Sequence, residues 1–574
     1  MRQIAIIGTG PRGLSALESF FVILSKGNPQ KDIKVTLFEP SDVPGTGTAW
    51  NTRQADTNWL NITERALKNL EGRPAIHLNE FGIPAFPSYT DWLPIEEQNL
   101  PEDAYDQFPP RRKLGNYLNQ RFESIFTVLE KEKLAVLKNT TIEAIDYKEN
   151  VFFIKDITNT QYQFEEIVLT IGHQPTILSD QLQQWKKHAM DNNLNVFIDP
   201  YPVKNILDTP IDTDACIGIR GFGLAMIDVM RALTIGCGGS FTITNKSTFE
   251  SVYHHGKKTT QCIVPFSLDG NPMIPKPINA AIDAWFTPTD SEIETFKHTI
   301  SAIAQGSKKV SNIWFLKNVI ADIASRIYQD LGEKSITHNK NASQLHVIIT
   351  NWLTDESHQD PLIQPIDNPA SVNIEAFINM ALGKSPISLD YCIGQVWRHC
   401  QPTLYKEFSH PTLPDEIIAE VISLDERSKR YSYGPPVESM QQMMALVRAD
   451  VLILDFANNP DIEFLSEGWQ LRYGENERII NVMINSVLDA PQLLEVQSPI
   501  IKSLLSNDII SPIHSELGIH TQTNGCVVLP DSINSISLSV LGRLAKGSVI
   551  GVDAILECFG SRIKDWAESA VRRI

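Results

Sequence analysis

The hydrophobic pattern of the first forty positions predicts one compact supersecondary unit. Residues 4–7 form an uninterrupted apolar run, which is typical of a strand buried on both faces of a parallel sheet. A glycine-rich turn follows at residues 8–13, and apolar side chains then recur on one helical stripe across residues 14–24. A second strand is expected at residues 33–38. The pattern therefore predicts strand, glycine turn, helix and strand.

A second copy of this pattern begins near Ala215. Its strand runs to Arg220, a second glycine turn follows, the helix ends near Leu233, and another strand is expected at residues 240–245. Between the two copies, shorter apolar runs predict further strands at residues 141–145, 151–154 and 166–170.

The chain changes character between about residues 290 and 510. Stretches with helical periodicity alternate with polar loops that contain proline. This part reads as a mostly helical insert. The clearest helices are expected at residues 290–304, 313–328 and 439–449.

Composition narrows the class of partner. The 574 residues carry a formal net charge of −18, and 42% of them are hydrophobic, as in ordinary soluble proteins. A phosphate backbone would need a basic patch to overcome this charge, so nucleic acid is not an expected partner. No apolar stretch is long enough to span a bilayer, and a strand begins too early to leave room for a targeting peptide. These features predict a cytoplasmic protein.

The seven cysteines form no C-x-x-C pair and are odd in number. Such spacing suits buried thiols in a reducing compartment. It also argues against a disulfide reductase, because those flavoenzymes carry a close cysteine pair beside the flavin. No clustered metal ligands occur in the sequence, so no metal site is expected.

The first glycine turn has the spacing G-x-G-x-x-G. Gly8 allows the tight turn, Gly10 lets the backbone approach a diphosphate, and Gly13 permits close packing of helix against strand. Pro11 costs nothing at the helix start, because its missing N–H would be unpaired there.

An acid completes this first unit. Glu39 ends the second strand, 26 positions after Gly13, where a carboxylate would bind ribose hydroxyls. Such an acid favours an unphosphorylated ribose, and hence FAD or NAD over NADP. The context of strand, helix and acid makes a dinucleotide site the better interpretation than a turn that serves packing alone.

Two later segments favour FAD at the first site. An apolar strand ends in the turn Ile171-Gly172-His173, similar to the segment with which two-dinucleotide flavoproteins complete the FAD domain. Gly221 and Gly223 then form the second glycine turn, where a nicotinamide dinucleotide, NADPH or NADH, would bind. Met226 replaces the third glycine, so a degenerate second site stays open as an alternative.

Several short motifs resemble one group of bacterial FAD/NAD(P)-binding proteins. Its members with assigned roles include a flavin-dependent urate hydroxylase and amino-acid N-hydroxylases acting on aspartate. The resemblance covers nearly the whole chain. The motifs are Gly8-Thr9-Gly10-Pro11-Arg12-Gly13, Phe38-Glu39-Pro40, the loop 45–50, Trp59-Leu60-Asn61-Ile62, Phe108-Pro109-Pro110-Arg111, Tyr433-Gly434-Pro435-Pro436, Leu541-Gly542-Arg543 and Gly551-Val552-Asp553.

The resemblance implies positions for further cofactor contacts. Asn61 and the loop 45–50 should lie near the flavin, and Asp553 near its ribityl or phosphate region. A loop-capping asparagine and a helix N-terminal acid are the plain alternatives for these two residues. One departure is notable: the chain has Ser267-Leu268-Asp269-Gly270 where relatives often have Ser-Arg-x-Gly, which puts nicotinamide or substrate contacts in doubt.

The predicted fold class is α/β, with two dinucleotide-binding (Rossmann-like) domains and a mostly helical insert. The expected activity is that of an NAD(P)H-dependent flavin monooxygenase, which adds one oxygen atom of O2 to a small nitrogen-containing substrate. A flavin oxidoreductase without oxygen insertion and a non-catalytic FAD-binding protein remain alternatives. No catalytic side chain can be assigned. The expected parts are residues 1–205 (FAD-binding, first part), 206–290 (NAD(P)-binding), 291–510 (helical insert) and 511–574 (return to the FAD domain).

Overall fold

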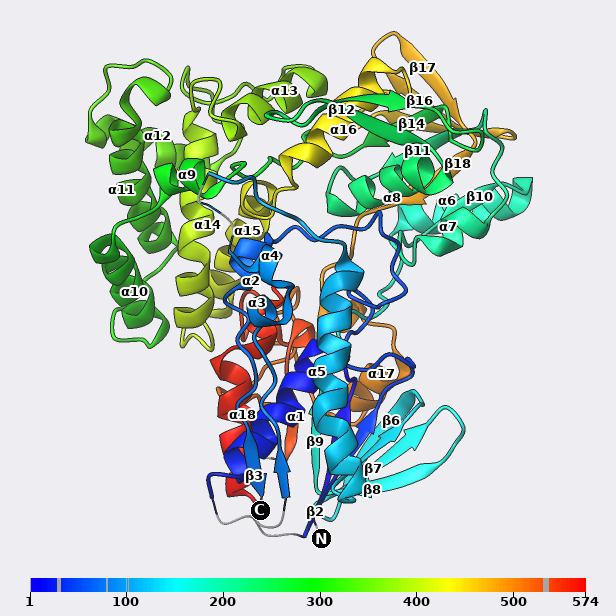
Figure 1. The fold of residues 1–574 in the computed structure, drawn as a ribbon, viewed down its shortest axis with the longest axis vertical. Helices are drawn as coiled ribbons and strands as arrows, with labels where there is room; N and C mark the ends of the chain where they lie inside the picture. The colour runs from blue at the N-terminus through cyan, green and yellow to red at the C-terminus, as the bar shows by residue number, and fades with distance from the viewer. Residues whose placement is uncertain (1, 28–31, 79–80, 100, 102, 530–535) are drawn as a thin grey trace.

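The computed structural model describes residues 2–27, 32–78, 81–99, 101, 103–529 and 536–574. Figure 1 shows one lobe that contains both ends of the chain and a broader part above it. The broader part holds a helical region on one side and a second sheet on the other. Arg2 donates to the carbonyl oxygen of Arg573 at 2.5 Å, so the two ends of the described chain meet.

The first lobe is built on a five-stranded sheet of order β19-β9-β1-β2-β5, and every neighbouring pair is parallel. The central strands are almost fully buried, as their continuous apolar runs require. One edge strand comes from near the end of the chain and pairs with β9. The strands are β1 (Arg2–Ile7), β2 (Ile33–Phe38), β5 (Ala135–Lys138), β9 (Glu166–Leu169) and β19 (Leu538–Val540).

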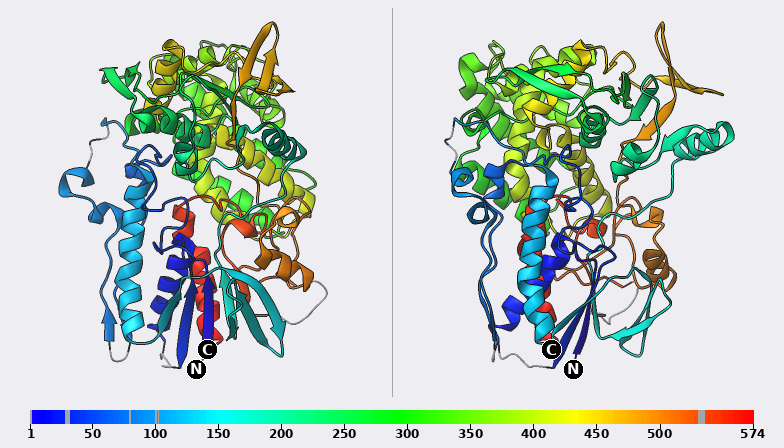
Figure 2. Two further views of the ribbon diagram at one scale, coloured as in Figure 1. Left: turned by 90° about the vertical axis from the view of Figure 1, so that its right-hand side faces the viewer. Right: turned by 45° about the vertical axis from the view of Figure 1, so that its right-hand side comes forward.

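Three long helices accompany this sheet: α1 (Pro11–Leu24), α5 (Arg111–Lys131) and α18 (Ser561–Arg572). The views of Figure 2 agree that the first and last helices of the chain lie side by side. Phe20 and Trp566 pack between them with ring centroids 6.3 Å apart. Burial of such large side chains is the main force that fixes the terminal helix on this domain.

An antiparallel sheet of three strands forms a second layer in the first lobe. These strands are β6 (Ile142–Lys148), β7 (Val151–Asp156) and β8 (Gln161–Phe164), and they pair in the order β6-β7-β8. Phe38 of β2 packs its ring edge-on against Phe164 of β8, with centroids 5.9 Å apart. The helix α17 (Pro499–Ser506) bonds to the same layer, because Ser503 Oγ accepts from the N–H of Ile145.

The second sheet is also parallel and has the order β10-β18-β11-β14. It brings together β10 (Asn195–Phe197), β11 (Cys216–Arg220), β14 (Cys262–Phe266) and β18 (Val482–Asn485). Strands from both sides of the predicted boundary at residue 205 therefore meet in one sheet. A fourth strand arrives from the stretch 291–510, which consequently contains more than helices.

The strand predicted at residues 240–245 is confirmed with the same bounds. A strand β12 (Ser240–Asn245) does form, but it pairs with β13 (Glu250–His254) in a separate hairpin and not with β11. The physical reason lies in the sequence: β12 is almost entirely exposed, whereas four consecutive residues of β14 are buried. A strand of a parallel sheet that is covered on both faces needs the continuous apolar run that β14 has.

The helical region contains most of the remaining chain and confirms the predicted helical insert. The predicted helix at 290–304 has the same bounds in the structure. A capping box at Thr289 and Glu292 begins it. The helices are α10 (Asp290–Ala304), α11 (Trp314–Leu331), α12 (Ala342–Thr354), α13 (Ala370–Ala381), α14 (Leu389–Glu407), α15 (Asp415–Ser432) and α16 (Val437–Arg448).

Two kinds of feature are absent from the described residues. None of the helices in the described ranges is long and apolar enough to cross a membrane. Nor do three or more His, Cys, Asp or Glu side chains gather as a metal site anywhere the structure describes.

Shorter elements connect the larger parts of the fold. They are α2 (Glu64–Leu67), β3 (Ile76–Leu78), β4 (Phe81–Ile83), α3 (Tyr89–Trp92), α4 (Ile95–Gln98), α6 (Asp180–Asn192), α7 (Lys204–Asp208), α9 (Ala280–Asp283), β15 (Asp461–Leu465), β16 (Gly468–Tyr473) and β17 (Asn476–Ile480).

Candidate functional site

The first glycine turn lies at the carboxyl end of β1, next to the end of β9. Gly8 has φ +90°, and a Cβ there would lie 2.8 Å from the carbonyl oxygen of Thr170. A Cβ on Gly13 would lie 2.2 Å from the carbonyl oxygen of Gly8. Both positions therefore require glycine, one for the turn and one for the close approach of α1 to the strand.

The start of α1 suits an anionic ligand. Gly10 is its N-cap and makes no side-chain hydrogen bond, Pro11 occupies the first helical position, and the first turn holds no acid. The N–H groups of that turn have no partner inside the helix, and the helix dipole places positive charge there. A Cβ on Gly10 would lie 3.4 Å from the Cα of Gly47, so the turn packs against the backbone of the loop 45–50. The residues fit a diphosphate.

Glu39 holds the glycine turn in shape. One carboxylate oxygen accepts from the backbone N–H of Thr9 at 2.8 Å and from its hydroxyl at 3.1 Å, and the other accepts from the N–H of Ser41 at 2.9 Å. The residue is 7% exposed. Pro40, which follows it, is exposed. Binding of ribose by Glu39 stays a prediction, and the oxygen that accepts from Ser41 keeps one lone pair for it.

Arg12 joins the glycine turn to the last part of the chain. Its guanidinium donates to the carbonyl oxygen of Val552 at 2.6 Å. A Cβ on Gly542 would lie 2.6 Å from Cδ of Arg12, so the arginine stem lies directly on that glycine. The predicted cofactor residue Arg12 thus has a positioning role: it fixes the segment that carries Asp553.

Asp553 lies among three cationic side chains. It pairs with Arg543, and Lys429 of α15 approaches to 3.3 Å. Burial opposes its ionisation, but Arg543, Lys429 and Lys546 together hold the pKa of this carboxyl well below its usual range. The last 35 residues and the helical region therefore meet at a charged carboxylate.

Asn61 is connected to this carboxylate through the helical region. Its side-chain amide donates to the carbonyl oxygen of Tyr433 at 3.4 Å, directly after α15. The ammonium of Lys429 lies 5.3 Å from the centre of the Tyr433 ring. Asn61 and Asp553, which the motifs place near one cofactor, are thus linked through Tyr433 and Lys429. The motifs predicted no contact for either linking residue. Tyr433 belongs to a quoted motif, but Lys429 has no local signal.

Gly172 follows the end of β9 beside the first glycine turn. It has φ +68°, and a Cβ there would meet no heavy atom within 4 Å. Thr170 donates from its hydroxyl to the carbonyl oxygen of Ile7 at 3.2 Å, which holds the two strand ends together. The backbone at Gly172 is therefore open on the side where a ligand of the first turn would extend.

The second glycine turn repeats the geometry of the first. Gly221 has φ +106°, and its Cβ would lie 2.7 Å from Oγ of Ser486. Gly223 is the N-cap of α8 (Leu224–Thr234), again without a side-chain hydrogen bond. The nearest atom to a Cβ on Gly223 is Sδ of Met273 at 3.9 Å, so this turn is more open than the first. Met226 is fully buried.

The strand beside the second turn ends in a serine. Gly221 donates its N–H to the carbonyl oxygen of Phe266 at 2.7 Å, as Gly8 does to Phe38 at 2.8 Å. Ser267, the next residue, therefore takes the place that Glu39 has in the first unit. The strand β12 and its end at Asn245 lie in the separate hairpin and not beside this turn.

An ion pair ties the two lobes together next to this turn. Arg111, from the first lobe, donates to the carboxylate of Asp228 on α8 at 2.6 Å, and the hydroxyl of Tyr201 donates to it at 2.5 Å. Arg231, one turn further along α8, lies 3.5 Å from the centre of the Trp59 ring. Trp59 and Arg111 both come from motifs quoted above, and their contacts position the second unit against the first.

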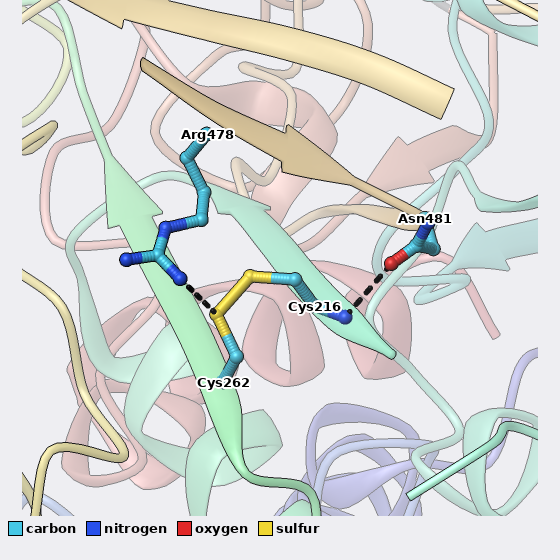
Figure 3. The surroundings of a disulfide bond; sticks show 4 residues. All are labelled: Cys216, Cys262, Arg478 and Asn481. Carbon is cyan, nitrogen blue, oxygen red and sulfur yellow. Dashed lines mark hydrogen bonds between the residues drawn. A yellow bond between two sulfur atoms is a disulfide. The ribbon is translucent and has the colours of Figure 1, made fainter. Parts of the chain in front are cut away.

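Cys216 and Cys262 form a disulfide, which corrects the expectation that the cysteines are all free thiols (Figure 3). The two residues are 46 positions apart, and the parallel pairing of β11 with β14 places them opposite each other. Sequence spacing could not show this, because register between distant strands is a tertiary property. Asn481 accepts from the N–H of Cys216 at 3.0 Å. Five cysteines stay free, and four of these are buried.

Comparisons with known proteins agree with the first unit. Residues 5–174 match the family model described as FAD-NAD(P)-binding, so this part of the chain is an FAD-NAD(P)-binding domain, as predicted. The chain is 28% identical over 247 residues to the nitrosuccinic acid synthase of Aspergillus oryzae and 25% identical over 273 residues to an L-aspartate N-monooxygenase (nitrosuccinate-forming) of Streptomyces davaonensis. The Streptomyces relative confirms the resemblance to N-hydroxylases acting on aspartate.

The two alignments cover less than half of this chain and of each relative. Each alignment takes in 42% of this chain, and the chain spans 37% of the Aspergillus protein and 40% of the Streptomyces protein. Among solved structures, an ornithine hydroxylase from Pseudomonas aeruginosa is similar with a TM-score of 0.45 and 8% identity, over 100% of this chain and 99% of that one.

Proposed function

We propose that the protein is an FAD-dependent monooxygenase that uses NADPH or NADH and O2 to hydroxylate nitrogen in a small amino-acid-like substrate. The observation that carries the proposal is the pair of glycine turns. Each ends a parallel strand, begins a helix and leaves its N-cap without a side-chain partner. Two turns of this kind in one chain support one site for a resident dinucleotide and one for a second dinucleotide.

The resident site belongs to the first turn. Its residues would bind the diphosphate through the N–H groups after Gly10, and Glu39 would accept from ribose hydroxyls while it orients Thr9. Asp553 would accept from hydroxyls of the ribityl chain, because its carboxylate stays ionised between Arg543 and Lys429. The chemistry that FAD supplies when bound is acceptance of hydride from a nicotinamide and activation of O2.

The chain's own part in the reaction is positioning and exclusion of water. The nicotinamide dinucleotide would bind at Gly221 and Gly223, on a unit that the Arg111–Asp228 pair holds against the first lobe. Tyr433, the residue directly after α15, accepts a hydrogen bond from Asn61 and so covers it. A water-poor space between these parts favours transfer of oxygen to the substrate over release of hydrogen peroxide.

The names of the two relatives support an amino acid as substrate. Both are described as enzymes that form nitrosuccinate, one of them from L-aspartate. We therefore expect a substrate with a primary amine and at least one carboxylate.

Purified full-length protein tests the proposal. We expect a yellow protein that releases FAD on denaturation, oxidises NADPH or NADH with uptake of O2, and does so faster with one member of a panel of amino acids and purines. Mass spectrometry should then find that substrate heavier by one oxygen atom. Nicotinamide oxidation that reduces a dye but never consumes O2 would indicate an oxidoreductase without oxygen insertion. A yellow protein inert to both nicotinamides would indicate a binding protein.

A further inference from the structure

Lys276 projects from a fixed point of the backbone, close to Asn61. It lies between Pro275 and Pro277, whose rings restrict the backbone on both sides. Its N–H donates to the carbonyl oxygen of Pro435 at 3.3 Å, and the hydroxyl of Tyr391 donates to the carbonyl oxygen of Pro275 at 3.1 Å. The segment is thus bonded to the loop after α15 and to α14.

The ammonium of Lys276 has a neutral partner. Its Nζ donates to the backbone carbonyl oxygen of Asn61, and among the residues that the structure describes no carboxylate lies within 4.0 Å of it. Burial and the charge of Arg398 lower the pKa of Lys276 to about 7, although Asp283 and Asp106 act in the opposite direction. A buried cation without a carboxylate is costly unless a ligand supplies one.

The two nearby acids already have cationic partners. Asp106 accepts from Arg65 at 2.9 and 2.7 Å. Asp283 pairs with Arg398 and lies 3.6 Å from Arg65. Three cationic side chains thus surround two carboxylates, with Lys276 as the third cation. The surplus charge at this point is positive.

Gln395 adds an unsatisfied donor on the same side of α14. Its side-chain oxygen accepts from Nε of Arg398 at 2.9 Å, but its amide nitrogen is fully buried and finds no partner among the described residues. It lies one helical turn after Tyr391, whose hydroxyl bonds to Pro275, so the two side chains leave α14 on the same face. A buried amide N–H group without an acceptor is costly, and an anionic ligand would satisfy it.

We propose that Lys276 and Gln395 bind a carboxylate of the substrate and thereby position its amine beside the flavin. This rests on the proposed monooxygenase function and on the resemblance that places Asn61 near the flavin. The carboxylate accepts from the lysine ammonium and from the glutamine amide. Lys276 is a positioning residue, and substrates without a carboxylate at this point are excluded because they leave both donors unpaired.

Succinate and its neutral isostere succinamide are suitable probes, since neither carries an amine to be hydroxylated. Calorimetry on the full-length, flavin-loaded protein should show binding of succinate and at least about tenfold weaker binding of succinamide. Lys276→Met should weaken succinate at least about tenfold, and Lys276→Arg should change it by less than about threefold. Lys297→Met, an exposed lysine on α10, is the matched control and should leave the affinity unchanged.

Two readouts separate recognition from a structural role. Above pH 7 the affinity of the unmodified protein for succinate should fall about tenfold per pH unit, because Lys276 loses its proton. Lys276→Arg should bind equally at pH 7 and pH 9. The other charged groups that face this point are Arg65, Asp106, Asp283, Arg398 and His399. His399 is also an ionisable side chain, so His399→Gln is the control. This variant should show the same fall of succinate affinity with pH as the unmodified protein.

The thermal midpoint of the ligand-free protein supplies the second readout. Lys276→Met removes a partly buried cation that has no carboxylate partner, so its midpoint should be unchanged or higher. A lowered midpoint with unchanged succinate affinity would show a structural lysine and overturn the inference, as would absence of succinate and L-aspartate binding to the unmodified protein. Failure of the proposed function looks different: the protein would then hold no FAD or leave nicotinamides unoxidised.

Discussion

The two glycine turns share a backbone and differ in what surrounds it. The first turn is enclosed by three contacts. The N–H of Gly45 donates to the carbonyl oxygen of Thr9 at 2.6 Å, and Arg12 donates to the carbonyl oxygen of Val552. The carboxylate of Glu39 accepts from the N–H of Thr9. The second has no acid at the matching position and leaves Gly223 open. An enclosed turn suits a cofactor that stays bound, and an open one suits a dinucleotide that enters and leaves at every turnover.

The third position of the motif gives the sharpest contrast between them. Gly13 cannot accept a Cβ, because the atom would lie 2.2 Å from a backbone oxygen, whereas Met226 sits fully buried at the equivalent position of the second unit. The helix of the second unit therefore stands further from its strand. The glycine that sequence motifs weigh most heavily is needed for packing in one unit and dispensable in the other.

The largest effect is expected from Gly13→Ala. Neither the Gly8 carbonyl nor α1 can move without disturbing the end of β1, the central strand of the sheet, so we expect a loss of about 4 kcal/mol or more in the free energy of unfolding and loss of bound FAD. Gly223→Ala is the matched control, since its Cβ meets nothing closer than 3.9 Å. Thermal unfolding and flavin absorbance measure both. If Gly223→Ala lost as much stability and FAD as Gly13→Ala, the inferred difference between the two turns would be wrong.

Removal of the disulfide should act on the second unit alone. Cys216→Ser with Cys262→Ser opens a covalent loop of 46 residues, which should cost about 2–4 kcal/mol of stability. Because the bond lies between β11 and β14, NADP⁺ binding should weaken while FAD stays bound. Cys237→Ser, a free and half-buried cysteine of the same unit, is the control. Loss of FAD in the double variant would show that the two units do not unfold separately.

How much of this was visible in the sequence follows from what local patterns encode. The run Ile4–Ile7, the two glycine turns and the helix α10 were predictable, because burial and turn chemistry are local properties. Strand partners are not: no local pattern shows that β14 and β18 are the neighbours of β11 and that β12 pairs elsewhere. The contact of Asn61 with Tyr433 was equally out of reach, since it joins residues far apart in the chain.

Glu39→Ala tests whether the acid stabilises the enclosed turn. The N–H groups of Thr9 and Ser41 would lose their acceptor, at a cost of about 1–3 kcal/mol, and FAD should dissociate more readily. Ser267→Ala removes the matching side chain of the second unit and should leave FAD affinity unchanged. Fluorescence titration of the apoprotein with FAD compares them. FAD affinity unaltered in Glu39→Ala would remove the argument that the acid distinguishes the resident site.

The smallest effect, and the most specific, is expected from placing an acid at the second unit. Ser267 follows Phe266 as Glu39 follows Phe38, so Ser267→Glu puts a carboxylate where a dinucleotide's adenosine ribose would lie. Repulsion from a 2′-phosphate should weaken NADP⁺ about tenfold, and NAD⁺ should bind as before or more tightly. Calorimetry on the flavin-loaded protein compares the two nucleotides, with Ser267→Ala as the control that changes neither. An equal loss for both nucleotides would mean that the new side chain blocks the site sterically, and no change for either would place the ribose away from β14. Only a loss confined to NADP⁺ supports the view that the two turns differ by one acid, and that its absence leaves room for a phosphorylated ribose.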